Sequence, residues 1–153
     1  MLVQLDEETL LGYLRRGFDG LLAVVDRLDH ERLNARPHGP STNSVAALVV
    51  HCCGVTEYWL GHVGLGRASD RDRDAELRAT ATADDLRVLV ARTLAQAEAD
   101  VARLVREGGQ ARHLDVREPL PGATTDATLV LHVLEELFQH LGHAELTADA
   151  LTS

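Results

Sequence analysis

The residues with the clearest potential for chemistry lie in HVLEELFQHLGHAEL, residues 132–146. Glu136 and His140 are four positions apart, so in a helix their side chains project from one face about one turn apart. Two such side chains can bind one metal ion, as the paired ligands of helix-borne metal sites do. The alternative is a surface acid–base pair that stabilises the helix. His132 and His143 continue the same polar stripe by about one turn in each direction.

A third ligand has to come from another segment, and His51 is the best candidate. It is the one strongly polar residue in an apolar stretch, and burying an imidazole costs free energy unless it is hydrogen-bonded or coordinated. Two imidazoles and one carboxylate leave open positions for water or substrate, which is characteristic of catalytic zinc, although nickel, iron or cobalt fits the same donors. The alternative for His51 is a hydrogen-bonded core residue. His132 and His143 are then expected to orient the ligands or to act as acid–base groups.

The remaining candidates have simpler expected roles. Cys52 and Cys53 are adjacent, which rarely suits a disulfide, and on a helix their side chains point about 100° apart. We expect both to pack as small apolar groups, with a redox role as the alternative. His62 is expected to interact with the dipole at the end of its helix. Three further histidines are expected in loops and in contact with water: His30, His38 and His113.

Four amphipathic segments can position these residues, because their apolar side chains recur every three or four positions. The segment that contains His51 is apolar almost all round, so it is expected to be buried. We predict an all-α four-helix bundle that forms one domain over residues 1–153. Long polar connections leave room for a crossover between helices. The predicted helices run over about Asp6–Asp29, Asn43–Val63, Ala83–Glu107, and from Thr125 or Asp126 to Ala148.

The charge and hydropathy of the chain exclude several classes of partner. The formal net charge is −9, with 24 acidic residues against 15 basic residues, all of them Arg, so a nucleic-acid partner is not expected. No apolar run approaches the roughly 20 residues that span a bilayer. Acidic residues stand at the start, where a signal peptide needs basic ones. We therefore expect a cytoplasmic protein without a membrane partner, for which a homodimer is one assembly to consider. The segment from Arg67 to Arg78 could present guanidinium groups to a carboxylate substrate, although most of these charges are expected in water.

Two stretches carry a resemblance to a known family. TNSVAALVVHCCGVTEYWL (residues 42–60) and EELFQHLGHAEL (residues 135–146) resemble the DinB-like superfamily, and within it the mycothiol-dependent maleylpyruvate isomerase N-terminal family. Many relatives place His where this chain has Glu136, whereas the isomerase-like branch uses Glu. The resemblance spans essentially the whole chain. It implies a bundle whose second and fourth helices supply the metal ligands, and enzymes that activate a small thiol such as mycothiol.

The resemblance also implies a type of reaction. A divalent cation, zinc above all with nickel or iron as alternatives, lowers the pKa of a thiol and favours the nucleophilic thiolate. The isomerase carries a further C-terminal domain, and this chain stops soon after its fourth helix. We therefore expect a thiol S-transferase that acts on a small-molecule thiol and an electrophile, with His51, Glu136 and His140 as ligands. The alternatives are a non-catalytic, stress-related metal-binding bundle and a metal-dependent hydrolase.

Overall fold

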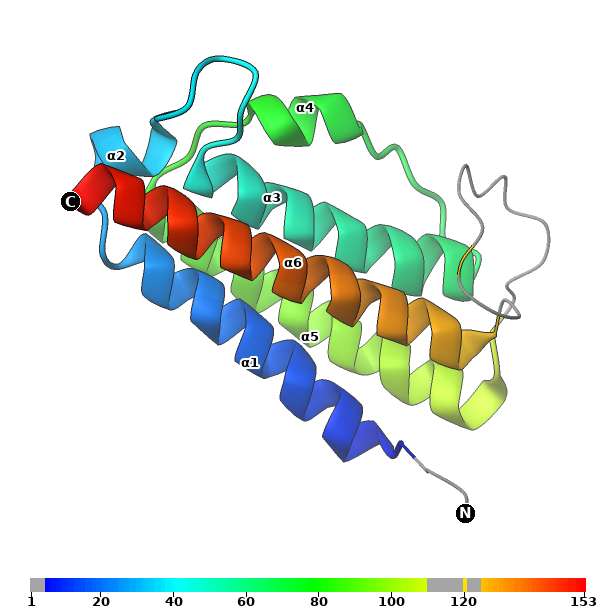
Figure 1. The fold of residues 1–153 in the computed structure, drawn as a ribbon. Helices are drawn as coiled ribbons and strands as arrows, with labels where there is room; N and C mark the ends of the chain where they lie inside the picture. Colours follow the sequence, from blue (N-terminus) through cyan, green and yellow to red (C-terminus); the bar gives the residue numbers. More distant parts are fainter. Residues whose placement is uncertain (1–4, 110–119, 121–124) are drawn as a thin grey trace.

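Four long helices dominate the computed structural model, which describes residues 5–109, 120 and 125–153 (Figure 1). No strand occurs within these ranges. The predicted all-α four-helix bundle is therefore confirmed. The long helices are α1 (Glu7–Val25), α3 (Val45–Thr56) continued by the π-helix η1 (Glu57–Gly64), α5 (Ala83–Glu107) and α6 (Asp126–Thr152). Two short helices accompany them: α2 (His30–Asn34) and α4 (Arg73–Arg78).

The long helices begin where a polar side chain accepts a hydrogen bond from the first turn, which satisfies an otherwise unpaired amide. Ser44 accepts from the amide of Ala47 at the start of α3. At α5, Thr82 and Asp85 form a reciprocal capping box. Helix α5 ends at Gly108, whose φ of +73° lies in the left-handed region that favours glycine. The predicted bounds of this helix, Ala83–Glu107, are confirmed.

The predicted first helix was too long at its C-terminal end. Helix α1 ends at Val25 because, after the cap residue Asp26, the amides of Arg27 and Leu28 bond to carbonyls three positions back in a tighter turn. Asp29, the predicted last residue of that helix, instead caps α2 by accepting from the amide of Arg32. His30 is therefore the first residue of α2 and not a loop residue, although it is exposed as expected.

The chain direction shows one crossover (Figure 1). Helices α1 and α6 run in one direction along the bundle, and α3 and α5 run in the other. Helices α5 and α6 each pack against both α1 and α3, so α1 and α3 occupy opposite corners. After η1 the chain returns along the outside of the bundle, and α4 lies in this return segment against α3. The crossover that the long polar connection suggested is thus found between α3 and α5.

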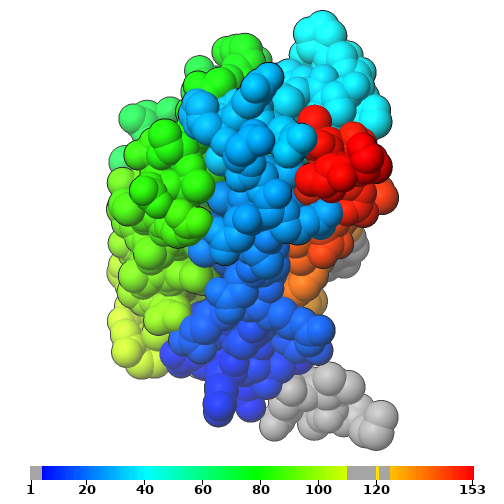
Figure 2. All heavy atoms as spheres, turned by 90° about the vertical axis from the view of Figure 1, so that its left-hand side faces the viewer, coloured from blue at the N-terminus to red at the C-terminus, as the bar shows by residue number. Residues whose placement is uncertain are grey.

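The core lies between the four long helices and is mainly aliphatic. Helix α3 is buried over most of its surface, as its apolar sequence predicted. At one end of the bundle, α2 and the loop before α3 lie beside the last turn of α6 (Figure 2). None of the helices in the described ranges has the length and hydropathy needed to cross a membrane. Large side chains with almost no exposure include Phe18, Leu21, Leu48, Leu86, Leu129 and Leu137.

Candidate metal centre

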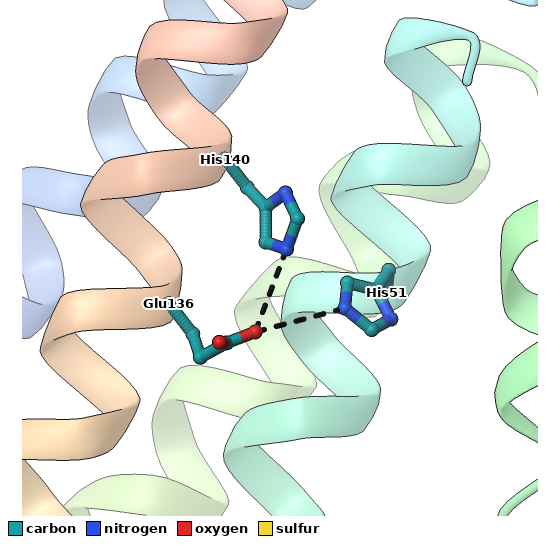
Figure 3. A group of neighbouring side chains, drawn as sticks. All are labelled: His51, Glu136 and His140. Atoms are coloured by element: carbon teal, nitrogen blue, oxygen red, sulfur yellow. Dashed lines mark ion pairs between the residues drawn. The ribbon is translucent and has the colours of Figure 1, made fainter. Parts of the chain in front are cut away.

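The three predicted ligands lie together between α3 and α6. His51 comes from the buried face of α3 and is 2% exposed, whereas Glu136 and His140 come from successive turns of α6. An oxygen of Glu136, Oε2, lies 3.9 Å from Nε2 of His51 and 3.5 Å from Nε2 of His140 (Figure 3). One ligand atom from each residue can be chosen so that all three lie within 4.8 Å of one another. The two segments predicted to supply donors therefore converge on one point.

These separations fit a single divalent ion. Donors at about 2.0–2.2 Å from a tetrahedral zinc ion lie about 3.4 Å from one another. The two separations from Glu136, 3.5 and 3.9 Å, are close to that value, so small side-chain rotations would complete the coordination. The rings of His51 and His140 are 4.8 Å apart between centroids and nearly perpendicular, at 87°. The residues present thus form a suitable donor set, and ions that prefer nitrogen and oxygen donors would fit it.

The charges in the site depend on the same contacts. The imidazoles of His140 and then His51 beside Glu136 lower the pKa of its carboxyl group well below its usual range, and they outweigh the burial that opposes this shift. Glu136 is therefore a carboxylate at neutral pH and can act as a ligand. Burial lowers the pKa of His51, but the neighbouring carboxylates of Glu136 and Glu76 outweigh it and leave a net increase.

Glu76 is a residue of the site that the sequence did not reveal. It lies on the short helix α4, and its Oε2 is 2.9 Å from Nδ1 of His51, on the side of the ring away from Glu136. Arg71 holds the same carboxylate with two hydrogen bonds, of 2.7 Å from Nε to Oε1 and 2.9 Å from Nη2 to Oε2. Burial raises the pKa of Glu76, but hydrogen bonds from His51 and Arg71 lower it by more. Glu76 is therefore an ionised hydrogen-bond acceptor behind His51.

A glycine makes room for this carboxylate. Gly54 lies one turn after His51 on α3, and a Cβ added there would collide with the carboxylate of Glu76. The glycine thus lets α4 approach α3 closely enough for Glu76 to reach the imidazole. Neither residue stands out in the sequence. Glu76 is one of several acids in a polar segment, and its only local signal is Asp72, which caps α4 through the amide of Ala75.

Comparison with known families identifies one that the chain matches. The chain matches the family model described as Mycothiol-S-transferase over residues 9–152, which is nearly its whole length. It belongs to the mycothiol S-transferase family. This supports the DinB-like resemblance, whereas membership of the narrower maleylpyruvate isomerase N-terminal family is not shown. Neither the curated proteins nor the solved structures yielded a significant match.

In this member of the S-transferase family, His132 and His143 flank the three donors and are not among them. The ring of His132 packs against Trp59 with 4.5 Å between centroids, and its Nδ1 lies 3.4 Å from a carboxylate oxygen of Glu135. His143 is exposed, and its ring centroid is 6.4 Å from that of His140. Partial burial, followed by the charges of His140 and His38, lowers the pKa of His143. Their orienting or acid–base roles stay predictions.

The two cysteines and the remaining histidines that the structure of this transferase-family chain describes lie outside the three-donor cluster. Cys52 and Cys53 are buried free thiols, and burial raises the pKa of both, that of Cys53 to about 12, as expected for packing groups. His62 lies in the last turn of η1, but its Nδ1 is 2.6 Å from the carbonyl oxygen of Arg67, beyond the helix, and not from a helix carbonyl. His38 is exposed, and His113 lies outside the described residues.

The Arg-rich segment differs from its predicted role. Arg67 donates two 2.8 Å hydrogen bonds to the buried carboxylate of Asp100 on α5, and Arg71 is bound to Glu76. Arg67 and Arg71 are thus bound to carboxylates of the protein itself, whereas Arg73 and Arg78 are exposed, as was expected for most charges of the segment. The two carboxylates are largely buried, and a buried carboxylate is costly unless it is paired.

Proposed function

We propose that this protein is a metal-dependent S-transferase that joins a small thiol of the mycothiol type to an electrophile. The observation that carries the proposal is the convergence of His51, Glu136 and His140 from two helices. Membership of the mycothiol S-transferase family supports the choice of thiol. A bound divalent ion, with zinc as the first choice and nickel or iron as alternatives, would favour the thiolate form of the substrate.

The protein's own residues would hold that ion and leave it accessible from one side. His51 closes the inner side of the site, because its side chain is almost fully buried. Glu136 and His140 are 28% and 22% exposed, so the side formed by α6 is open to solvent and to small molecules. Three protein donors leave at least one coordination position for a substrate atom, as in catalytic zinc sites.

The reaction also requires proton transfer. As the sulfur–carbon bond forms and the bond to the leaving group breaks, the thiol proton must pass to a base and the leaving group must be protonated or released as an anion. We assign these steps to His143 and His132, the two histidines that flank the donors on α6. His143 is solvent-exposed and can exchange its proton with water between turnovers. His132 is held between Trp59 and Glu135.

The proposal is tested by measuring metal content and thiol transfer on the same sample. Protein purified without a metal-affinity tag should contain about one ion per chain by elemental analysis, and should conjugate mycothiol to a bimane-type electrophile faster than it conjugates glutathione. Replacing His140 by Ala should remove both properties. The exposed His30, replaced by Ala, is the matched control and should retain both.

Other outcomes of this experiment distinguish the alternatives. A stoichiometric ion with no turnover of any small thiol would overturn the transferase proposal and favour a non-catalytic metal-binding bundle. Hydrolysis of simple esters or amides, lost in the His140 variant and without thiol transfer, would favour a hydrolase. A cytoplasmic location and a homodimer remain part of the same proposal, to be tested by fractionation of the producing cells and by light scattering.

A further inference from the structure

We infer that Glu76 is a positioning residue for the metal centre: its carboxylate fixes the proton of His51 on Nδ1 and so directs the Nε2 lone pair toward the ion. The inference rests on the ion site of the proposed function, but not on the thiol or the reaction. It assigns a task to α4, a helix outside the four-helix bundle.

The hydrogen-bonding capacities of the two groups lead to this assignment. An ionised carboxylate can only accept hydrogen bonds, so the 2.9 Å contact between Oε2 of Glu76 and Nδ1 of His51 requires the proton on Nδ1. In a neutral imidazole the other nitrogen then carries the lone pair. That nitrogen, Nε2, faces Glu136 at 3.9 Å. Nη2 of Arg71 also lies near Nδ1, but at 3.5 Å, too far to compete with the carboxylate.

Glu76 is itself held in place from two sides. Arg71 binds both of its oxygens, and bidentate pairs of this kind add geometric specificity as well as energy. The guanidinium carbon of Arg71 lies 5.3 Å from the centroid of the Tyr58 ring on η1, within the range of a cation–π contact. Gly54 leaves the space that the carboxylate fills. The carboxylate therefore has one position, and His51 one ring orientation.

Hydrogen bonds attach helix α4 to the rest of the protein. None of its residues is fully buried, so apolar burial contributes little to its attachment. It accepts a hydrogen bond from His51 through Glu76 and another, from Arg36 in the loop before α3, through the carbonyl oxygen of Leu77. Partners that orient ligand histidines typically change metal affinity or activity by about 10- to 100-fold when they are removed. We expect an effect of this size for Glu76.

The first experiment measures ion affinity directly. Zn²⁺ is titrated into metal-free protein in competition with a chelating dye, for the wild-type chain and the Glu76→Gln variant. The variant should bind Zn²⁺ roughly 10- to 100-fold more weakly. Asp74→Asn is the matched control, because it removes the same charge from an exposed position of the same helix. It should bind like the wild type. Equal affinities for all three proteins, or equal losses in the two variants, would overturn the inference.

The second experiment needs no variant and therefore does not depend on whether a variant folds. In protein labelled with ¹⁵N-histidine, two-bond nitrogen–proton spectra identify the protonated ring nitrogen of His51 in the zinc-loaded state. We expect the proton on Nδ1. A proton on Nε2 would overturn the inference. The proposed function can fail separately: loss of zinc affinity in Glu76→Gln, together with no thiol transfer by the wild type, would retain the role of Glu76 and reject the transferase.

Discussion

Two regions of this molecule contain the same kind of arginine–carboxylate pair, but the two pairs differ in what they contact next. In each, an arginine from the crossover binds a mostly buried carboxylate through two hydrogen bonds, and a helical glycine makes room for the charged group. Arg71 binds Glu76 beside Gly54, and Arg67 binds Asp100 beside Gly61. The carboxylate of Glu76 also accepts a hydrogen bond from the imidazole of His51, whereas the other partner of Asp100 in the described part of the chain is the side-chain amide of Gln96.

The comparison shows that a buried ion pair does not by itself mark a functional site. Both pairs satisfy a carboxylate that would otherwise be costly to bury. What differs is the next contact in the chain of hydrogen bonds. We therefore expect changes around Glu76 to alter ion binding, and changes around Asp100 to alter stability alone.

The largest expected effect is at the ion itself. His140→Ala removes one of the three donors, and the two that remain should not retain an ion through dialysis. Elemental analysis should find less than about one-tenth of the wild-type zinc content. Full zinc occupancy in this variant would mean that the three donors are assigned wrongly. The region around Glu76 would then differ from the region around Asp100 in some other way than ion binding.

Removal of the ion should destabilise the protein by a smaller amount. An ion at about 100 times its dissociation constant stabilises the folded state by about 2.7 kcal/mol, so a chelator should lower the thermal midpoint by roughly 5–10 °C. Thermal melts followed by circular dichroism measure this difference. The difference should persist in Arg67→Ala and vanish in His140→Ala. A chelator effect of equal size in both variants would contradict the separation of the two regions.

The second region should respond through stability. Arg67→Ala leaves Asp100, which is 5% exposed, with Gln96 as a remaining partner, and we expect a loss of about 1–3 kcal/mol. The loss should be below that of a fully buried pair, because the Arg67 side chain is 40% exposed. Urea unfolding of metal-free protein measures it. A change in zinc affinity beyond about twofold would show that this pair also supports the site.

The glycines allow the most closely matched test of the comparison. In Gly54→Ala the new methyl group displaces Glu76, so zinc should bind about tenfold more weakly, which corresponds to about 1.4 kcal/mol. In Gly61→Ala the methyl group displaces Arg67, and zinc affinity should stay the same. Both substitutions add the same atoms and the same helix propensity. Equal zinc affinities in the two variants would mean that displacing Glu76 does not weaken zinc binding.

The candidate ligands and the long helices could be predicted from the sequence because each depends on local spacing. Glu136 and His140 share a helix face whatever surrounds them, and His51 is conspicuous in an apolar stretch. The whole of α5 was predicted because its apolar side chains recur at helical spacing and a glycine marks its C-terminal end. These signals lie within a few residues of the feature that they define.

Glu76 could not be predicted because its role depends on the crossover. It is one acid among several in a polar segment, and only packing of α4 against α3 selects it. The π-helical turns of η1 were also missed. They follow α3 without a break, and the apolar pattern alone does not distinguish their wider hydrogen bonding. They present Tyr58 to Arg71 and Trp59 to His132.

The return of the chain between α3 and α5 has a consequence for how the protein comes apart. Residues 51 and 136 are 85 positions apart (136 − 51), and the chain between them includes the crossover and all of α5. An ion held by both would act as a reversible cross-link that closes this large loop and restricts the unfolded chain, as a disulfide does. The chain could then unfold fully only after the ion is released, so the lifetime of the native state should follow the rate of ion dissociation.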